Sequence, residues 1–205
     1  MDPERLPFKL LRYMIDRNYG WFKRVNRIFL ELDLDIFSNV IACISVANII
    51  ERLTQRDSDN WKLNVSSKPK LRTYALFKHD LKTELYVKSL LPKYKRSILC
   101  QFRSGVLPLS IETGRYRNVP ACERFCEICN SGVIEDETHF LCMCPMFREL
   151  KDELYLNVKY LDPSILLDQL TDSEKLIMLM EDRFIKCTAN FIFDAWTIRQ
   201  NIMFC

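Results

Sequence analysis

Glycine and histidine are scarce in this sequence, which has 4 glycines and 2 histidines among 205 residues. It contains no tandem repeat, low-complexity tract or Gly/Ser linker, so a repeat architecture is excluded. The length suits one ordinary domain or two small ones. No uninterrupted apolar segment follows the first residues, which predicts that the protein has no signal peptide. We expect it to be intracellular, nuclear or cytoplasmic, and not secreted.

Long apolar runs are also missing from the sequence. The longest, residues 36–50, is interrupted by Ser38, Asn39, Ser45 and Asn48, and it is too short to span a bilayer. We therefore predict a buried helix in this region and expect no membrane partner.

Cysteine, by contrast, is abundant, with nine residues. An odd number of cysteines without a secretory signal favours metal ligation over a disulfide framework. Cys126 and Cys129 form a Cys-x-x-Cys pair, and His139 and Cys144 follow after spacers of nine and four residues. Three thiolates and an imidazole are the four ligands that a closed tetrahedral zinc site needs. The spacing therefore predicts a zinc knuckle that holds one structural Zn²⁺.

Two further cysteines are alternative ligands. Cys122 lies four residues before Cys126, and Cys142 lies two residues before Cys144. The remaining cysteines are expected to behave as small hydrophobic residues within helices: Cys43, Cys100, Cys187 and Cys205.

The small net charge of +3 conceals an uneven distribution. Basic and acidic residues number nine and nine in residues 1–61, thirteen and three in 62–120, and eight and fifteen in 121–205, which gives 0, +10 and −7. A concentrated positive charge favours a surface that binds a polyanion such as nucleic acid. The alternative is a solvated helix face that the acidic C-terminal third neutralises.

Within this basic segment the sequence predicts a helix over residues 93–104, ended by Gly105. Tyr94, Ile98 and Phe102 fall on one side of that helix and form a stripe for the core. The cations on the opposite side and at the edge of the stripe are predicted to contact phosphates: Lys93, Lys95, Arg96 and Arg103.

Residues 105–117 are predicted to form a loop in which Gly114 supplies a turn. Three residues beside this turn combine groups suited to phosphate contact and base stacking: Arg115, Tyr116 and Arg117. For Glu112 we favour an ion pair with one of these arginines. In that interpretation Tyr116 fills a gap in the core.

The rest of the chain shows mainly helical periodicity. We predict a mainly α fold, a multi-helix array with a small Cys-Cys-His-Cys zinc knuckle inserted between helices. Helices are expected over 7–30 (weakened at Gly20, which is also a candidate break into two helices), from Asp33 or Asp35 to about Arg56, and over 145–157, 165–170 and 184–204, with a polar turn at 57–60 and a capping box at 171–174. The predicted segments are an N-terminal helical linker segment (1–60), a basic helical segment and loop (61–120), the zinc knuckle (121–150) and acidic and apolar helices (151–205).

An ordered set of motifs runs through much of the chain: Leu71…Tyr74-x-x-Phe77-Lys78, Phe102-Arg103-Ser104-Gly105, Leu109-Ser110-Ile111-Glu112-Thr113-Gly114-Arg115-Tyr116, Cys126-x-x-Cys129, Glu135-Asp136-Glu137-Thr138-His139-Phe140-Leu141 and Cys144-Pro145. Over about residues 45–200, this set resembles the C-terminal region of LINE-type (non-LTR) retrotransposon reverse transcriptases. The resemblance implies zinc at Cys126, Cys129, His139 and Cys144, and it favours Cys144 over Cys142 as the fourth ligand. It also implies that the surrounding basic surface handles RNA or target DNA.

The sequence departs from this family where catalysis is concerned. No Asp-Asp pair occurs, so the palm carboxylates that resemble Tyr-x-Asp-Asp in this family are missing, and 60 upstream residues leave no room for fingers and palm. A Cys-x-x-Cys pair that precedes His139 reverses the order found in zinc deaminases, and four ligands leave no open position for a catalytic water. We assume that the second histidine, His79, lies on the surface. We therefore expect no enzyme.

The expected function is that of a detached reverse transcriptase tail that binds RNA or DNA. A separate reverse transcriptase core is a further expected partner, and no small-molecule substrate is expected. The alternative is a zinc-stabilised protein-interaction module without a nucleic-acid role.

Overall fold

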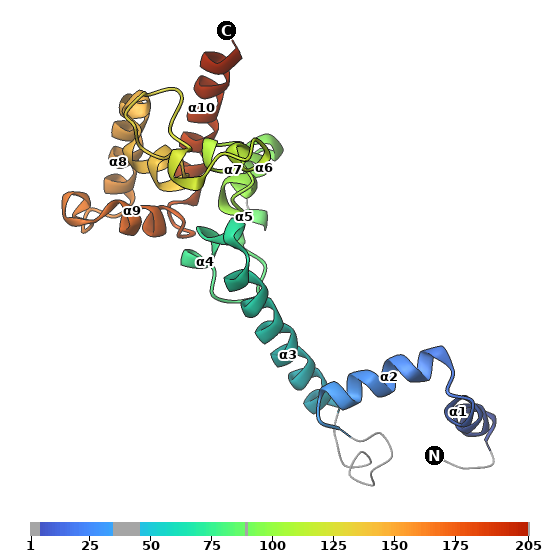
Figure 1. The fold of residues 1–205 in the computed structure, drawn as a ribbon. Coiled ribbons are helices and arrows are strands. Elements are labelled where there is room, and N and C mark those ends of the chain that lie inside the picture. The colour runs from blue at the N-terminus through green and yellow to red at the C-terminus, as the bar shows by residue number, and fades with distance from the viewer. Residues whose placement is uncertain (1–4, 35–45, 89, 205) are drawn as a thin grey trace. The chain divides into compact units, whose positions relative to one another are not determined.

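The computed structural model describes residues 5–34, 46–88 and 90–204, and the chain is mainly helical over these ranges (Figure 1). An isolated antiparallel bridge between Phe125 and Ile134 is the one piece of β-structure in the described part of the chain. The predicted mainly α fold with a Cys/His cluster between helices is confirmed. The chain divides into two compact units, residues 1–61 and 62–205.

The first unit contains α1 (Leu6–Asp16), α2 (Gly20–Glu31) and the N-terminal part of α3 (Val46–Ser67). The helix predicted over residues 7–30 is therefore two helices. They are separated at Asn18, whose positive φ of 49° does not continue a right-handed helix. Most of the buried helix predicted within residues 36–50 lies outside the described residues, as do Cys43 and Cys205. Its described end is helical, but the prediction that it is buried is wrong there, because Val46 and Ile50 of α3 are 73% and 57% exposed.

The polar turn predicted at residues 57–60 is wrong, because α3 continues through it to Ser67. Within this stretch the side-chain amide of Gln55 donates to the Asp59 carboxylate one helical turn away at 2.9 Å. Arg56 also pairs with Asp57 at 2.9 Å. Polar side chains that favour turns are accommodated in an exposed helix when neighbouring side chains satisfy them.

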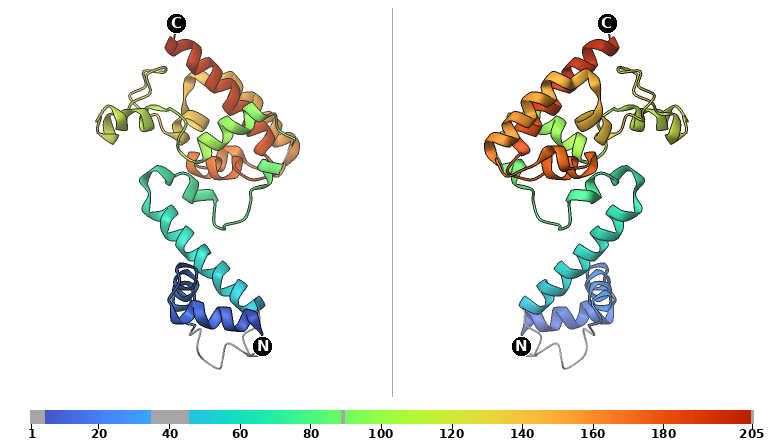
Figure 2. Two further views of the ribbon diagram at one scale, coloured as in Figure 1. Left: turned by 90° about the vertical axis from the view of Figure 1, so that its right-hand side faces the viewer. Right: turned by 90° about the vertical axis from the view of Figure 1, so that its left-hand side faces the viewer.

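In the second unit, α10 (Ile185–Phe204) packs against both α6 (Lys93–Arg103) and α8 (Arg148–Leu161), and α8 and α10 run side by side in Figure 2. The predicted capping box is confirmed: the Thr171 N–H donates to the Glu174 carboxylate at 2.8 Å, and the Glu174 N–H donates to the Thr171 hydroxyl at 3.3 Å. Shorter helices complete this unit: α4 (Tyr74–Phe77), α5 (Leu85–Lys88), α7 (Ser110–Tyr116) and α9 (Asp172–Leu179).

Aromatic side chains form the centre of this unit. Phe102 of α6 and Phe191 of α10 are buried together with Phe140 and Phe147. The Phe140 ring centroid lies 5.9 Å from Phe102, 5.1 Å from Phe147 and 6.5 Å from Phe191, in tilted and edge-on arrangements that favour aromatic packing. Because Phe140 directly follows one predicted metal ligand and Phe147 lies three residues after another, this core anchors the second half of the knuckle.

The remaining helix predictions are met to different degrees. Residues 145–157 form a 3₁₀ turn (Pro145–Phe147) followed by α8, and the prediction over 184–204 corresponds to α10. Only a 3₁₀ turn (Leu167–Gln169) occurs within residues 165–170. No helix in the described ranges combines the length and the apolar character needed to cross a membrane.

Candidate metal centre and basic surface

Four side chains from two neighbouring segments meet in one cluster, and they are the ligands predicted from the sequence: Cys126, Cys129, His139 and Cys144. Their ligand atoms all lie within 4.8 Å of one another, and Cys129 Sγ is 3.4 Å from His139 Nε2. Tetrahedral coordination with Zn–S bonds of about 2.3 Å places ligand atoms about 3.8 Å apart. Small side-chain adjustments therefore suffice for these residues to hold a metal ion.

A turn positions the first pair, Cys126 and Cys129. The Cys126 N–H donates to the Val133 carbonyl at 2.9 Å, which brings the two arms of the turn together. Asn130 and Gly132 have positive φ values of 52° and 70°, conformations that these two residue types adopt more readily than others. This turn is where the sequence places Asn-Ser-Gly, directly after the Cys-x-x-Cys pair.

A single π-helical turn, η4 (His139–Met143), positions the second pair. The Cys144 N–H donates to the His139 carbonyl at 2.7 Å, so two residues five positions apart come to lie on adjacent turns. The Asp136 carboxylate accepts the His139 N–H at 2.8 Å and fixes the start of the turn. The four-residue spacer between His139 and Cys144 is therefore the length that one π turn requires.

The close approach of these groups changes their acidity. The hydrogen bond with Cys144, together with burial, raises the pKa of Cys126 to about 12, and the same hydrogen bond lowers the pKa of Cys144. Burial by itself lowers the pKa of His139, but hydrogen bonds with Cys126 and Cys129 raise it overall. Binding of an ion must therefore displace protons from the cluster, because metal ligands are deprotonated.

The other two candidate thiols lie outside the cluster. Cys142 is buried, and burial raises its pKa to about 12. Its carbonyl accepts a hydrogen bond from Lys151 Nζ at 3.2 Å. Cys122 is exposed. The geometry therefore favours Cys144 as the fourth ligand.

Glu135 connects the cluster to the surrounding helices, a role that the sequence did not indicate. Its side chain is 1% exposed and accepts hydrogen bonds from Arg199 Nε (2.7 Å) and Nη2 (2.8 Å) of α10. It also accepts the backbone N–H and the hydroxyl of Ser110, both at 2.7 Å, and lies 3.8 Å from Cys126 Sγ. Burial raises the pKa of Glu135, but the hydrogen bonds and charge of Arg199 bring it below its usual value.

The prediction that residues 105–117 form a loop is wrong over Ser110–Tyr116, which form α7. The Ser110 N–H at the start of α7 is bound by Glu135, 25 residues later, whereas the N-cap residue Leu109 makes no side-chain cap. The usual local start signal of a helix is therefore missing here. Gly114 lies inside the helix and supplies no turn. A Cβ atom at this position would come within 2.7 Å of the Arg124 side chain. Gly105 ends α6 with a φ of 66°, as predicted.

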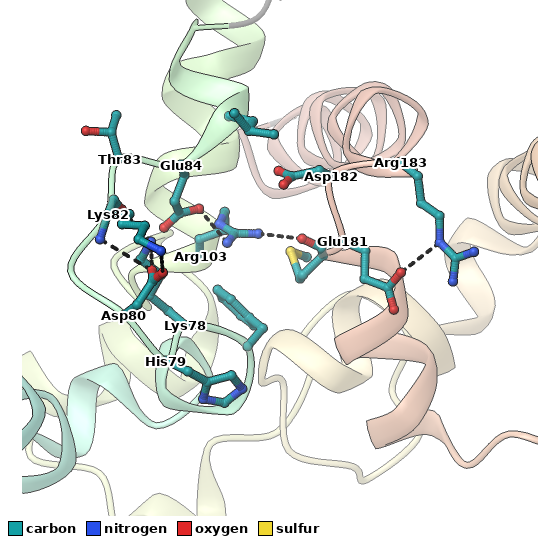
Figure 3. A pocket seen from close by; sticks show the side chains of 13 residues that line it. Lys78, His79, Asp80, Lys82, Thr83, Glu84, Arg103, Glu181, Asp182 and Arg183 are labelled. Carbon is teal, nitrogen blue, oxygen red and sulfur yellow. Dashed lines mark hydrogen bonds and ion pairs between the residues drawn. The ribbon is translucent and has the colours of Figure 1, made fainter.

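Arg103 does not face solvent, contrary to the prediction from the helical wheel. It is 5% exposed, forms an ion pair with Glu84 and donates to the Met180 carbonyl at 3.1 Å (Figure 3). Its guanidinium carbon also lies 4.2 Å from the centre of the Phe77 ring. The segment before α6 and the turn after α9 therefore cover the face of α6 that the wheel assigned to water.

The pocket beside Arg103 has a volume of about 720 Å³. Its charged lining is balanced, because four cations (Lys78, Lys82, Arg103 and Arg183) face four acids (Asp80, Glu84, Glu181 and Asp182). Asp80 pairs with both lysines and Glu181 pairs with Arg183 (Figure 3). The pocket therefore offers no net charge to an anion. His79, which also lines it, is exposed.

The other predicted cations of α6 remain at least partly accessible. Lys93 is exposed, and Arg96 donates to the Val87 carbonyl at the end of α5 at 3.2 Å. Lys95 donates to the Asn190 side chain at 2.7 Å. Tyr94 is 55% exposed, which corrects its place in the predicted core stripe, because its ring packs at the edge of the core against Phe193.

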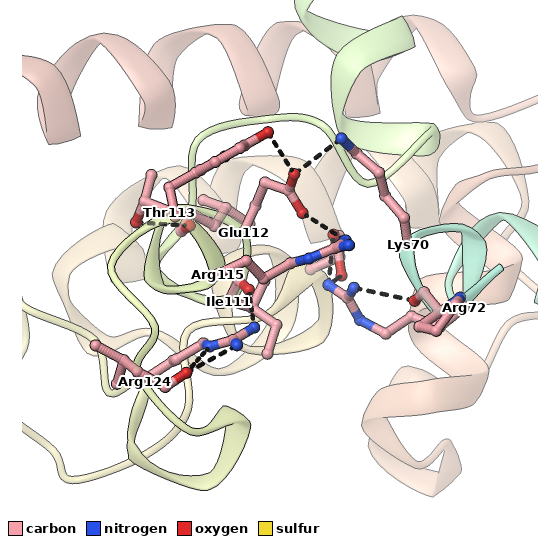
Figure 4. Close-up of polar contacts among 12 residues, drawn as sticks. Lys70, Arg72, Ile111, Glu112, Thr113, Arg115 and Arg124 are labelled. Carbon is pink, nitrogen blue, oxygen red and sulfur yellow. Dashed lines mark hydrogen bonds and ion pairs between the residues drawn. The ribbon is translucent and has the colours of Figure 1, made fainter.

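The residues predicted beside Gly114 project from the end of α7, where Arg115, Tyr116 and Arg117 are all exposed. Glu112 is buried and accepts hydrogen bonds from Arg115 Nη1 at 3.3 Å and from the Tyr116 hydroxyl at 3.2 Å. Lys70 Nζ lies 2.8 Å from the same carboxylate (Figure 4). The interpretation of Glu112 as an ion-pair partner is confirmed. Tyr116 fills no gap in the core, because it is 76% exposed.

Ion pairs reduce the net charge that the basic segment presents. Seven of the thirteen cations in residues 62–120 pair with a carboxylate, including Arg72 with buried Glu137 at 2.7 Å and Arg117 with Glu127 at 3.1 Å. The other six form no ion pair within the described ranges: Lys62, Lys68, Lys88, Lys93, Lys95 and Arg96. Three of them, Lys88, Lys93 and Arg96, lie at the adjoining ends of α5 and α6.

Comparison of the chain with models of protein families, with curated proteins and with solved structures gives no match.

Proposed function

We propose that this chain is a zinc-stabilised nucleic-acid-binding module that corresponds to the C-terminal tail of a LINE-type retrotransposon reverse transcriptase. The observation that carries the proposal is the meeting of Cys126, Cys129, His139 and Cys144 in one cluster. The motif resemblance supports it, because the same four residues and the segment that becomes α7 belong to that set of motifs. RNA or DNA is the proposed partner, together with a reverse transcriptase core.

The chemistry of the donor set favours zinc. Three thiolates and an imidazole are soft and borderline ligands that suit Zn²⁺ and disfavour Mg²⁺ or Ca²⁺. Four protein ligands close the coordination sphere, so the ion has a structural role and holds two chain segments together. In small peptides such sites contribute on the order of 10–16 kcal/mol of apparent binding free energy, much of it coupled to folding.

Two groups of cations support a nucleic-acid surface. The first, at the adjoining ends of α5 and α6, comprises Lys88, Lys93 and Arg96. The second comprises Arg115 and Arg117 at the end of α7, a helix whose first turn is bound to the knuckle through Glu135. The knuckle thus positions α7, and the cations proposed to contact nucleic acid lie on the helices around the knuckle.

The dependence of binding on salt tests this proposal. If the surface neutralises about six phosphates, affinity for RNA or single-stranded DNA should fall roughly a thousandfold between about 50 and 200 mM salt. The double substitution Lys93→Gln/Arg96→Gln should lower the affinity and the salt slope. A matched control, Lys159→Gln/Lys186→Gln, removes two exposed cations from α8 and α10 and should change neither.

One observation favours a second candidate, a zinc-stabilised protein-interaction module. Leu156, Tyr160 and Leu161 of α8 are 69%, 84% and 54% exposed, and apolar surface of this kind suits a protein partner. This candidate predicts no binding to RNA or single-stranded DNA even at low salt. That result would contradict the nucleic-acid proposal.

A further inference from the structure

Tyr116 is an exposed aromatic residue whose ring is nevertheless held in place. It is the last residue of α7 and is 76% exposed. Its hydroxyl donates to Glu112 Oε1 at 3.2 Å. An exposed tyrosine without such a bond exchanges between rotamers, and ordering it on binding costs free energy. The hydrogen-bonded Tyr116 side chain is exposed but already restricted in its rotamers, so ordering it on binding costs less free energy.

The acceptor of this bond is itself fixed. Glu112 is 4% exposed, and Lys70 Nζ lies 2.8 Å from the oxygen that accepts the tyrosine hydroxyl. Burial raises the pKa of Glu112, but the hydrogen bond and charge of Lys70 bring it below its usual value, so the carboxylate stays ionised near neutral pH. Lys70 and Glu112 therefore act as positioning residues for the ring.

The helix that carries Tyr116 is held by hydrogen bonds from Arg124. Arg124 passes against Gly114 and donates to the Ile111 carbonyl at 2.7 Å and to the Val119 carbonyl at 2.8 and 2.9 Å (Figure 4). These bonds join α7 to the chain that leads into the metal centre. The hydrogen bond of the Tyr116 hydroxyl to Glu112 therefore holds the ring, and the bonds of Arg124 to two backbone carbonyls hold the helix that carries it.

Tyr116 lies between two arginines in the sequence, Arg115 and Arg117. The side chain of Arg115 is 43% exposed and that of Arg117 is 56% exposed, although each contacts a carboxylate. An exposed aromatic ring at the same helix end as two cations suits a nucleic-acid strand, because a base can stack on the ring and phosphates of the same strand can contact the guanidinium groups. Bases within a duplex are stacked on each other and leave no free face for the ring.

We propose that Tyr116, positioned by Glu112 and Lys70, is a stacking platform for an unpaired base, so the ligand of this surface is single-stranded nucleic acid. The inference rests on the proposed function and narrows its ligand class. Single-stranded RNA and single-stranded DNA share the required chemistry, and separate titrations distinguish them. Stronger binding of RNA would assign a role to the 2′-hydroxyl.

The test uses the full chain loaded with zinc and short oligonucleotides that contain 2-aminopurine, whose fluorescence falls on stacking. Single-stranded RNA, single-stranded DNA and a duplex of the same sequence are titrated at low salt. Tyr116→Leu removes the ring and should weaken single-strand binding about tenfold and abolish the fluorescence change. Duplex affinity should stay within about twofold. Tyr160→Leu, which removes a comparably exposed ring from α8, is the control and should behave like wild type.

A second variant tests the tether. Tyr116→Phe keeps the ring but loses the hydroxyl, so it should retain the fluorescence change and bind more weakly than wild type and more tightly than Tyr116→Leu. If Tyr116→Leu loses single-strand and duplex affinity equally, or loses none, the stacking role of Tyr116 is refuted. The proposed function is not contradicted by that result. Absence of binding by the wild-type chain to every oligonucleotide would overturn both.

Discussion

Arg199, in the last helix, donates two hydrogen bonds to Glu135, which lies 64 residues earlier and contacts Cys126 of the Cys/His cluster. The two residues are 6% and 1% exposed, so the pair is buried. Because Glu135 also binds the start of α7 through Ser110, this pair joins the C-terminal helix, the knuckle and the helix that carries Tyr116. The stability of the Cys/His cluster should therefore depend on residues that lie far from it in the sequence.

The first prediction concerns this buried pair. Arg199→Met should lower the free energy of unfolding by about 3–5 kcal/mol, because it leaves the Glu135 carboxylate buried without its cation. Chemical denaturation of the zinc-loaded chain measures the effect. Arg183→Met is the matched control: Arg183 is half exposed, and loss of its surface pairs with Asp162 and Glu181 should cost about 1 kcal/mol or less. Similar losses in both variants would refute the special role of the buried pair.

The second prediction distinguishes the two neighbouring thiols. Cys144→Ser should lose the metal and destabilise the fold, because Cys144 belongs to the four-ligand cluster. Cys142→Ser should keep the metal, because Cys142 lies outside the cluster and is buried beside it. Elemental analysis of the two purified variants decides the matter. Full zinc content in Cys144→Ser would refute the ligand assignment.

The third prediction concerns Gly114. Replacing glycine by alanine within a helix normally stabilises it by about 1 kcal/mol. At this position the added Cβ would lie 2.7 Å from Cγ and Cδ of Arg124, whose guanidinium is held by two carbonyls. Gly114→Ala should therefore destabilise the chain by about 1–3 kcal/mol, as overpacking does.

Two comparisons test that explanation by thermal or chemical denaturation. Gly20→Ala, where no atom lies within 4 Å of the new Cβ, should be neutral or stabilising. Adding Arg124→Ala to Gly114→Ala should remove the steric penalty, so that the two substitutions are not additive. Additive losses would show that Arg124 is not the reason for the glycine.

The fourth prediction concerns pH. The pKa of Glu112 lies below its ordinary value in the folded chain: burial raises it, but Lys70 lowers it more. The ionised carboxylate therefore contributes stability that is fully present above the unfolded pKa of about 4.3 and is lost as pH falls through the folded value. The difference in unfolding free energy between wild type and Glu112→Gln should be largest near neutral pH and shrink below pH of about 4.3.

Denaturation of both proteins across this pH range provides the measurement. Protonation of the metal ligands affects both proteins equally, so the difference between them isolates Glu112. A difference that grows as the pH falls would contradict the predicted direction of the pKa shift.

The sequence by itself determined the local features of this protein. The spacing of three cysteines and one histidine predicted the cluster, because a Cys-x-x-Cys turn and a four-residue spacer bring ligands together over short distances. Helical periodicity predicted α6 and α10, and local capping signals predicted the start of α9 and the end of α6 at Gly105. These features depend on neighbours within a few residues, which a sequence displays directly.

The tertiary structure alone decided the features that depend on distant partners. Arg103 is buried because the segment before α6 and the turn after α9 cover it, and the first N–H of α7 is bound by the distant Glu135. In both cases a group far away in the sequence binds a charged group or an N–H donor. The local sequence pattern alone would predict that water binds it. For Tyr116 the distant contribution is that of Lys70, which pairs with the Glu112 carboxylate that accepts the tyrosine hydroxyl. Glu112 itself is a local partner on the same helix, which the sequence displays directly.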